Sequence, residues 1–514
     1  MSAHSSPPSH RPWLTPVLAG LLAVSALALS ACAGSGAVAT ASSGSATLKW
    51  ASSSFPAHWD PVVSGSGAQF RELALVYASL TRTDAQGHAV PDLAESWKYN
   101  TAGDEITFHL RPGLAFSDGT PVNAAAVKAA VERAKTQKNS ALFGDLTSIR
   151  SVTTGGDLDV VVHLTQTDYQ IPLLFGERVL QIASPRAAAD PTTLDQQPVG
   201  AGPFIVTQLI PGTKAILKKN PNYWDAENIH ITNVELISAP DAATVVSGLQ
   251  TGVYNFADIE PSQASAAKSA GLDVFVQPGF NASNISLNVN KAPFSNPKVV
   301  DAVRYAINRK EFVDKLTFGY GQSTDEPFPP GYVAYDPRSA DLYPYNPARS
   351  RQLLTEAGYQ PGAIKLTLDI QSAQPDAEIV QSQLAAVGIT VSIKVDKNWA
   401  TPFFSKDLVL SLYGTTGRDS AVQTLTAHFG PNGPLNLSSP YQPAGFQKAI
   451  AKVRQTKLDA PDYASTLQAA TRTGLRSTAL VFTYSSPNLF AKSTSISTLP
   501  AIPGHIDWTG VRVN

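Results

Sequence analysis

The sequence predicts an α/β protein with more than one lobe, and three observations lead to this prediction. The chain has 514 residues, which favours two to four domains at roughly 100–200 residues per domain. Hydrophobic residues make up 43% and charged residues 15%, a balance typical of globular proteins. From Thr47 onward, segments with strand-like alternation and segments with helical spacing follow one another. This order favours α/β lobes over a solenoid or an all-β sandwich.

The charge balance and the cysteine count exclude several classes of protein. The chain carries 39 Lys and Arg against 40 Asp and Glu, so its formal net charge of -1 provides no field that would attract a polyanion. We therefore expect no nucleic-acid partner. The single cysteine excludes an internal disulfide framework, and a chain of this size does not need one.

The N-terminus predicts export and a lipid anchor. An apolar run from Leu14 to Ala31 is followed at once by Cys32, the only cysteine. About 18 apolar residues are near the lower limit for a membrane-spanning helix, so an uncleaved anchor is the alternative. The run ends in small residues, as cleavable signals do. Leu29-Ser30-Ala31-Cys32 resembles the lipobox of bacterial lipoproteins, which implies that Cys32 is lipidated and that the protein works outside the cytoplasm.

Local periodicity predicts individual helices and strands. Apolar residues alternate in EITFHLRPG (105–113) and in LDVVVHL (158–164), and the segment 121–135 between them has helical spacing. Asn296-Pro297 and Asn346-Pro347 have the sequence of helix starts, another helix is expected from Arg309, and Gly358 is a natural helix end. Further strands are expected at 365–370, 388–395 and 407–414. The loop 325–337 is too long for a simple turn, and such loops often carry function.

Four stretches of the mature chain carry a family resemblance. They are 90–134 (with PDLAESW and FSDGTP), 198–225 (with PVGAGPF and NPNYW), 286–316 (with APF and AINR) and, more weakly, 345–359 followed by 383–395. Together they resemble the extracellular solute-binding proteins of the dipeptide/oligopeptide/nickel family. The resemblance implies a type II periplasmic-binding-protein fold with two hinged lobes and an extra subdomain in the first. The implied divisions are a signal peptide 1–31, a flexible tether 32–46, lobe I (47–80, 200–280 and 486–514), an inserted subdomain 81–199 and lobe II (281–485).

The resemblance also implies a function and partners. We expect a monomer that captures a small solute, for which a short peptide is the leading interpretation, and delivers it to an ABC permease driven by a separate ATPase. A nickel chelate, an opine or a sugar are the alternative ligands. A sensor or adhesion lipoprotein that has lost transport is the alternative role.

Enzyme motifs do not account for the chain. Ser265 to Lys268 and Ser295 to Lys298 match Ser-x-x-Lys, but neither is accompanied by Ser-Asp-Asn or Lys-Thr-Gly. The nine histidines are scattered, without a pair at metal-ligand spacing. Paired carboxylates of a glycosidase need not be close in sequence, so that alternative stays open. We expect a binding protein with no catalytic residue, no metal and no cofactor.

The resemblance points to five candidate ligand contacts. Peptide-binding relatives hold the ligand's amino terminus with an acid after a strand, and here Asp419 follows the expected strand 407–414. Arg418 could take a carboxylate, unless it only pairs with Asp419 in a surface loop. Trp399 matches a recurring family tryptophan near the cleft, and Tyr413 and Tyr484 are further candidates. We expect Trp97, Trp224, Phe116 and Phe294 to be core or lobe-packing residues and not ligand contacts.

Overall fold

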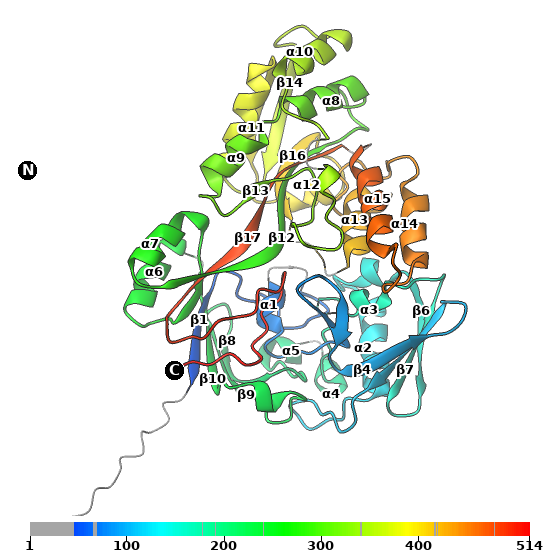
Figure 1. Ribbon diagram of the computed structural model, residues 1–514, viewed down its shortest axis with the longest axis vertical. Helices are drawn as coiled ribbons and strands as arrows, with labels where there is room; N and C mark the ends of the chain where they lie inside the picture. Colours follow the sequence, from blue (N-terminus) through cyan, green and yellow to red (C-terminus); the bar gives the residue numbers. More distant parts are fainter. Residues whose placement is uncertain are drawn as a thin grey trace, which may run out of the picture. The chain divides into compact units, whose positions relative to one another are not determined.

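A large mixed sheet runs through the protein, and its strands come from both ends of the chain (Figure 1). The computed structural model describes residues 46–64, 69–176, 178–190, 192–239, 241–339, 342–415, 418, 420–476 and 479–514. The strand order is β15-β14-β16-β12-β17-β11-β1-β10-β9-β8, and β13 also pairs with β17. Their bounds are β1 Thr47–Ser52, β8 Phe204–Ile210, β9 Lys214–Lys219, β10 Asn233–Ser238, β11 Phe256–Asp258, β12 Asp273–Leu287, β13 Gln322–Ser323, β14 Ile364–Ile370, β15 Ile389–Val395, β16 Leu410–Thr415 and β17 Leu480–Lys492.

Two long antiparallel strands, β12 and β17, join the parts that the sequence assigns to lobe I and lobe II. One end of β12 pairs with β17 near β11, whereas its other end pairs with both β16 and β17. The pairing is irregular between Gln277 and Asn281, opposite Ser486 to Asn488. Pro278 and Pro487 lie in these stretches, and a proline cannot donate to the ladder. The strands therefore have fewer ladder hydrogen bonds where the predicted lobe boundaries fall, although the boundaries themselves stay predictions.

Helices pack on the lobe II part of the sheet in two groups. The first group is α8 (Pro297–Ala306), α9 (Arg309–Leu316), α10 (Pro347–Glu356) and α11 (Pro375–Ala386), whose apolar residues form one core cluster with those of β14 to β16. The second group is α12 (Ala400–Phe404), α13 (Ala421–Phe429), α14 (Phe446–Gln455) and α15 (Tyr463–Arg476). The expected helix starts at Pro297, Arg309 and Pro347 and the three expected strands are confirmed.

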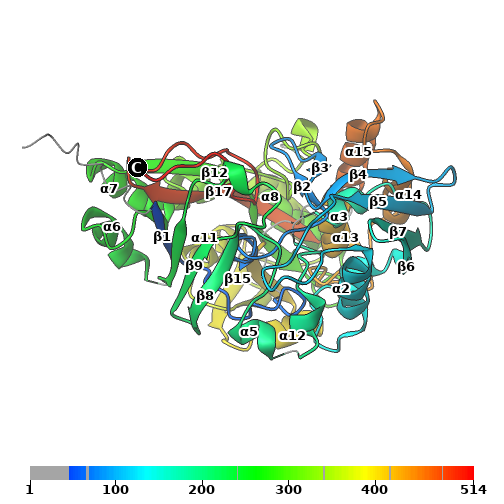
Figure 2. The ribbon, with the colours of Figure 1, turned by 90° about the horizontal axis from the view of Figure 1, so that it is seen from below.

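The inserted segment forms a separate antiparallel sheet of order β4-β5-β7-β6, with α2 packed on β6 and β7 (Figure 2). Its elements are β2 Thr81–Thr83, β3 Ala89–Pro91, β4 Ala94–Tyr99, β5 Glu105–Leu110, α2 Ala124–Thr136, β6 Ile149–Gly155 and β7 Asp159–Leu164. The Asn123 side chain caps α2 by accepting from the Ala126 N–H. The expected strands at 105–113 and 158–164 and the helix between them are confirmed, and β5 and β7 pair directly.

The remaining helices are short, and the longest of them, α6, has nine residues. They are α1 Phe70–Leu73, α3 Ile171–Leu174, α4 Pro185–Ala188, α5 Thr193–Gln196, α6 Ala242–Gln250 and α7 Ala264–Ser269. Short 3-10 segments also occur, among them η2 at Phe143–Leu146. Phe116 and Phe294 are buried in the core, and Trp97 and Trp224 are partly buried and pack against the core of the inserted segment. In the parts of the chain that the structure describes, no helix is both long and apolar enough to cross a membrane.

Candidate ligand-binding site

The carboxyl ends of three parallel strands lie along one edge of the lobe II sheet. β14 pairs in parallel with both β15 and β16, so these strands end on the same side, at Ile370, Val395 and Thr415. Ligands of open α/β sheets bind outside such carboxyl ends. We call this side of the sheet the carboxyl edge. The candidate residues Trp399 and Arg418 follow β15 and β16, and Asp376 follows β14.

Arg418 reaches from the carboxyl edge to the inserted segment. Its Nη1 donates to Asp145 Oδ2 at 2.9 Å, and both side chains are mostly buried. Its backbone N–H donates to Thr424 Oγ1 at 3.2 Å, which fixes the residue beside the start of α13. Asp145 belongs to η2, far away in sequence. Asp419 lies outside the described residues, so its role and its pairing with Arg418 stay predictions.

Helix α13 carries polar side chains that sequence reasoning missed. His428 is buried, and its Nδ1 lies 2.8 Å from the Thr424 carbonyl oxygen. A carbonyl can only accept, so Nδ1 carries the proton and Nε2 is an acceptor. Burial lowers the pKa of His428 to about 4, so the ring is neutral at physiological pH. Within the described part of the chain, Nε2 has no hydrogen-bond partner, and neither amide atom of buried Gln423 has one.

Asn284 on β12 is a third buried side chain whose polar atoms lack hydrogen-bond partners among the described residues. It stands in register with Tyr413 of β16 and Phe482 of β17, and the His428 ring lies 5.6 Å from the Phe482 ring. Asn284 is fully buried, and neither of its amide atoms has a partner among the described residues. Buried polar atoms are nearly always hydrogen-bonded in proteins. The sequence around Asn284 contains Asn281, Ser283 and Ser286, so nothing in the local pattern distinguishes Asn284.

Trp399 and Tyr413 meet in one aromatic cluster. The Trp399 ring stacks on Phe403 with 4.4 Å between ring centroids and lies 6.0 Å from the Tyr413 ring. The Trp399 Nε1–H donates to Ser411 Oγ, and the Tyr413 hydroxyl donates to the Leu435 carbonyl, both at 2.8 Å. The polar atoms of Trp399 and Tyr413 are therefore hydrogen-bonded to the protein itself, and both rings are buried. A direct ligand contact by either residue stays a prediction.

Tyr484 belongs to a different cluster from Trp399 and Tyr413. Its ring stacks against Phe312 of α9, and burial raises the pKa of its phenol. The carboxylate that affects this phenol most strongly is Asp376, whose Oδ2 accepts from Ser283 Oγ at 3.2 Å. Burial raises the pKa of Asp376, and its Oδ1 has no partner among the residues described. Asp376 is an acid near the carboxyl edge that the sequence did not single out.

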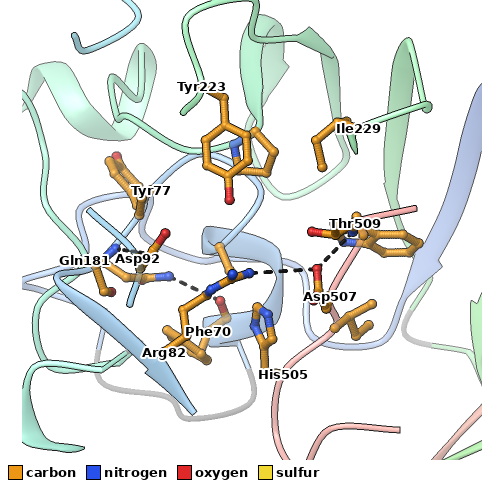
Figure 3. A pocket seen from close by; sticks show the side chains of 16 residues that line it. Phe70, Tyr77, Arg82, Asp92, Gln181, Tyr223, Ile229, His505, Asp507 and Thr509 are labelled. Carbon is orange, nitrogen blue, oxygen red and sulfur yellow. Dashed lines mark hydrogen bonds and ion pairs between the residues drawn. The ribbon is translucent and has the colours of Figure 1, made fainter. Parts of the chain in front are cut away.

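A small cavity in the lobe I part is a structural junction (Figure 3). Its volume of about 40 Å³ suits a single water molecule and not a peptide. Beside it, Trp224 Nε1–H donates to Asp92 Oδ1 at 2.7 Å, which joins the NPNYW and PDLAESW motifs. Arg82 faces Asp507 at 3.9 Å and links the inserted segment to the C-terminal segment. These motifs stabilise the fold. Trp399, Arg418 and Asp376 of the carboxyl edge do not line this cavity.

Two arginines of the 286–316 motif are paired inside the protein. Arg304 and Arg309 are both buried, and Arg309 forms an ion pair of 2.5 Å with Asp325. Arg304 pairs with Asp301 at 3.1 Å. The loop 325–337 is largely buried and supplies Asp325, so this loop encloses the charge of Arg309. No group of three or more His, Cys, Asp or Glu side chains in the described ranges could hold a metal ion.

Comparison with known proteins identifies the family. The model of bacterial extracellular solute-binding proteins, family 5, matches residues 88–435, and the chain belongs to this family. Proteins of this family bind solutes and are not enzymes. The glutathione-binding protein GsiB of Salmonella typhi is 32% identical over 309 residues, which cover 59% of this chain and 60% of that protein. Heme-binding protein A of Haemophilus influenzae is 29% identical over 346 residues, which cover 60% of this chain and 62% of that protein. The chain thus spans about 60% of the length of the curated relatives it matches.

Solved structures confirm the fold. The periplasmic binding protein DppA of Helicobacter pylori, in complex with the peptide STSA, is 22% identical with a TM-score of 0.79 over 91% of this chain and 98% of that chain. HbpA2 of Haemophilus parasuis is 24% identical with a TM-score of 0.76 over 91% of this chain and 100% of that one. The expected α/β periplasmic-binding-protein fold is therefore correct.

Proposed function

We propose that this protein is a lipid-anchored receptor that binds a short peptide at the carboxyl edge of lobe II and delivers it to an ABC permease with a separate ATPase. The observation that carries the proposal is a group of buried polar side chains without partners among the described residues, namely Gln423 and His428 of α13, which follows Arg418, and Asn284 of β12. Peptides present N–H donors and C=O acceptors in equal number. The two amides offer donors and acceptors, and His428 Nε2 offers an acceptor. These side chains complement a peptide backbone.

Two charged residues extend this complementarity. We propose that Arg418, which also pairs with Asp145, attracts a ligand carboxylate and that Asp419 holds the ligand's ammonium group. An ammonium enclosed without a counter-charge would carry a large desolvation cost, so a peptide receptor needs such an acid. The glutathione named for one relative and the peptide bound to a structural neighbour support this ligand class.

The anchor is the second part of the proposal. Lipidation at Cys32 would supply more than one acyl chain, which anchors a protein stably, whereas a single chain gives only marginal binding. The segment 32–46 is rich in Ser, Gly and Ala, a composition that forms flexible linkers. The binding domain would then lie near the outer membrane face without being embedded.

A nickel chelate is the second candidate ligand. Neutral imidazole is the form of histidine that binds metals. The Nε2 atom of buried His428 is unprotonated and has no hydrogen-bond partner among the described residues. A chelate that brings its own ligands would need only this one nitrogen from the protein. No comparable observation favours an opine or a sugar as the ligand.

Native mass spectrometry of the purified protein, with sequencing of the released ligand, tests the proposal. We expect a free-amino peptide that is released unchanged. Titration calorimetry with that peptide should then show a loss of about 2–5 kcal/mol for Asp419→Asn, the usual cost of breaking a buried charge pair. Asp314→Asn, which removes an exposed ion pair on α9, is the matched control. A released nickel complex, or a released ligand without an amino group, would reject the peptide proposal. Unchanged affinity of Asp419→Asn for a free-amino peptide would reject the role of Asp419 alone.

A further inference from the structure

A large cavity lies between the inserted segment and the α14–α15 part of lobe II. It has a volume of about 1020 Å³, at the upper end of the range of small-molecule sites. We call it the aromatic groove, and its principal lining residues are Trp97, Tyr99, Tyr169, Val333, Lys457 and Tyr463. Neither Trp399, Arg418 nor Asp376 is among its lining residues. The groove is therefore separate from the proposed solute site.

The walls of the groove come from two parts of the protein. One wall is the β2–β3 hairpin and β4 of the inserted segment, and the other is the α14–α15 connection with Val333 of lobe II. Figures 1 and 2 both draw α14 and α15 beside the inserted segment. The shape of the groove therefore depends on how lobe II meets the inserted segment.

Direct contacts hold the two walls together. The Tyr169 N–H donates to the Arg454 carbonyl at 2.8 Å, and the Tyr463 hydroxyl donates to Gln170 Oε1 at 2.8 Å. Arg454 also forms an ion pair with buried Asp168.

The second contact between the walls is the close approach of Gly87, in the β2–β3 hairpin, to Tyr332 of lobe II. Gly87 has a φ of +85°, and a Cβ there would overlap the ring of Tyr332 from lobe II. Only glycine fits this backbone conformation and this spacing without strain. The groove is thus bounded by two packed contacts between the same two parts.

The side chains of the groove define the chemistry of its ligand. Trp97, Tyr99 and Tyr169 are all half-buried, and Tyr99 and Tyr169 pack edge to face with 4.7 Å between ring centroids. The Tyr99 hydroxyl donates to the Asp168 carbonyl and the Tyr463 hydroxyl to Gln170, so these two rings face the groove mainly with carbon. Ring faces and edges of this kind favour planar aromatic partners.

Charge adds a second requirement. Lys98 and Lys457 line the groove against a single acid, Asp459, and the Lys457 ammonium lies 5.9 Å from the centre of the Tyr169 ring. The lining therefore has an excess of positive charge next to its aromatic rings. We infer that the aromatic groove is a second binding site, distinct from the solute site, which takes a planar aromatic acid.

A ligand in the groove would contact the inserted segment and lobe II at once. It would stabilise the arrangement in which the two walls meet over any in which they separate. By linkage it would increase the affinity for a solute that favours the same arrangement. The groove ligand is then an allosteric effector of solute capture.

Fluorescence titration with 8-anilinonaphthalene-1-sulfonate, an aromatic sulfonate, tests the inference on the full chain. We expect one saturable site, with a Kd raised about tenfold, or about 1.4 kcal/mol, in Lys457→Glu and in Tyr169→Ala. Lys452→Glu, an exposed change on α14 outside the groove, should leave the Kd unchanged. Lys457 is exposed, so its variant keeps the test valid if Tyr169→Ala fails to fold.

Two outcomes overturn the inference. Non-saturable binding with the same response in all variants would mean adsorption to the surface. A signal that is lost in Arg418→Ala and kept in Lys457→Glu would place the probe at the carboxyl edge. Neither outcome bears on peptide binding, which the calorimetry measures separately, and failure of the peptide proposal leaves the groove titration unaffected.

Discussion

Arg418 Nη1 lies 2.9 Å from Oδ2 of Asp145, although 273 residues separate the two along the chain. The ion pair joins the carboxyl edge of lobe II to the inserted segment, and both side chains are more than four-fifths buried. A partly buried pair is screened less by salt than an exposed one. It therefore stabilises the arrangement in which the two parts meet.

We expect Asp145→Asn to speed solute release. Removing the charge weakens the arrangement in which the two parts meet without touching the proposed amide group, so the Kd should rise about 3- to 10-fold, mainly through the dissociation rate. Stopped-flow dissociation of the identified solute measures this. Asp314→Asn is the control because its ion pair with Lys310 is exposed and lies within α9. Equal dissociation rates in wild type and Asp145→Asn would show that the pair does not control opening.

Replacing His428 tests the buried polar group. His428→Leu keeps the approximate size of the side chain and removes the Nε2 acceptor, so a ligand donor would lose its partner. Leaving a buried donor unpaired costs about 1–3 kcal/mol, which corresponds to a roughly 5- to 150-fold weaker solute affinity. Titration calorimetry measures the solute affinity. Thr426→Val on the same helix is the control, because the Thr426 hydroxyl donates to backbone carbonyls of α13. An unaltered affinity would assign His428 to packing alone.

Glu326 predicts a pH dependence of stability. Burial raises the pKa of its carboxyl group to about 9, far above the ordinary 4.5. The folded state therefore holds a proton that the unfolded state releases between these pH values, so the free energy of unfolding falls as pH rises from about 5 to 9. The stabilisation is fully present only below the unfolded pKa.

Glu326→Gln should remove this slope. The neutral amide imitates the protonated acid, and its oxygen can still accept from the Asp336 N–H. A tenfold difference in proton affinity is about 1.4 kcal/mol. We therefore expect the free energy of unfolding, measured with urea, to fall between about pH 5 and about pH 8 in the wild type. The fall should exceed that of Glu326→Gln by at least about 1.4 kcal/mol. Glu132→Gln on the exposed face of α2 is the control. Parallel pH profiles in all three proteins would contradict an uncharged Glu326.

Cys32→Ala tests the anchor. No other residue of the chain can form a thioether with lipid, because Cys32 is the only cysteine. We expect unprocessed precursor or released protein in membrane fractionation, and loss of the lipid mass in mass spectrometry. Ser43→Ala, within the tether, should behave as wild type. Membrane retention of a correctly cleaved Cys32→Ala protein would contradict lipidation.

The sequence by itself determined the elements and the family-like motifs. Apolar periodicity fixes which face of a short segment is buried, and this is a local property, so the helices at Pro297, Arg309 and Pro347 and the strands of the inserted segment were predictable. The family resemblance selected Trp399 for the cleft, and the usual role of large aromatic residues assigned Trp97 to the core or to lobe packing. Trp399 is buried against Phe403, whereas Trp97 lines the aromatic groove.

Only the tertiary structure decided which polar groups meet. Arg418 pairs with Asp145, and the Tyr463 hydroxyl bonds to Gln170, across long distances along the chain. The burial of Asn284 and His428 likewise arises only when distant segments pack together. Such contacts depend on the order of strands in the sheet and on the packing of helices over it, which hydrophobic periodicity does not specify. A polar side chain has the same sequence signature in solvent as in a buried site, because its desolvation and its partners are set only when the chain has folded.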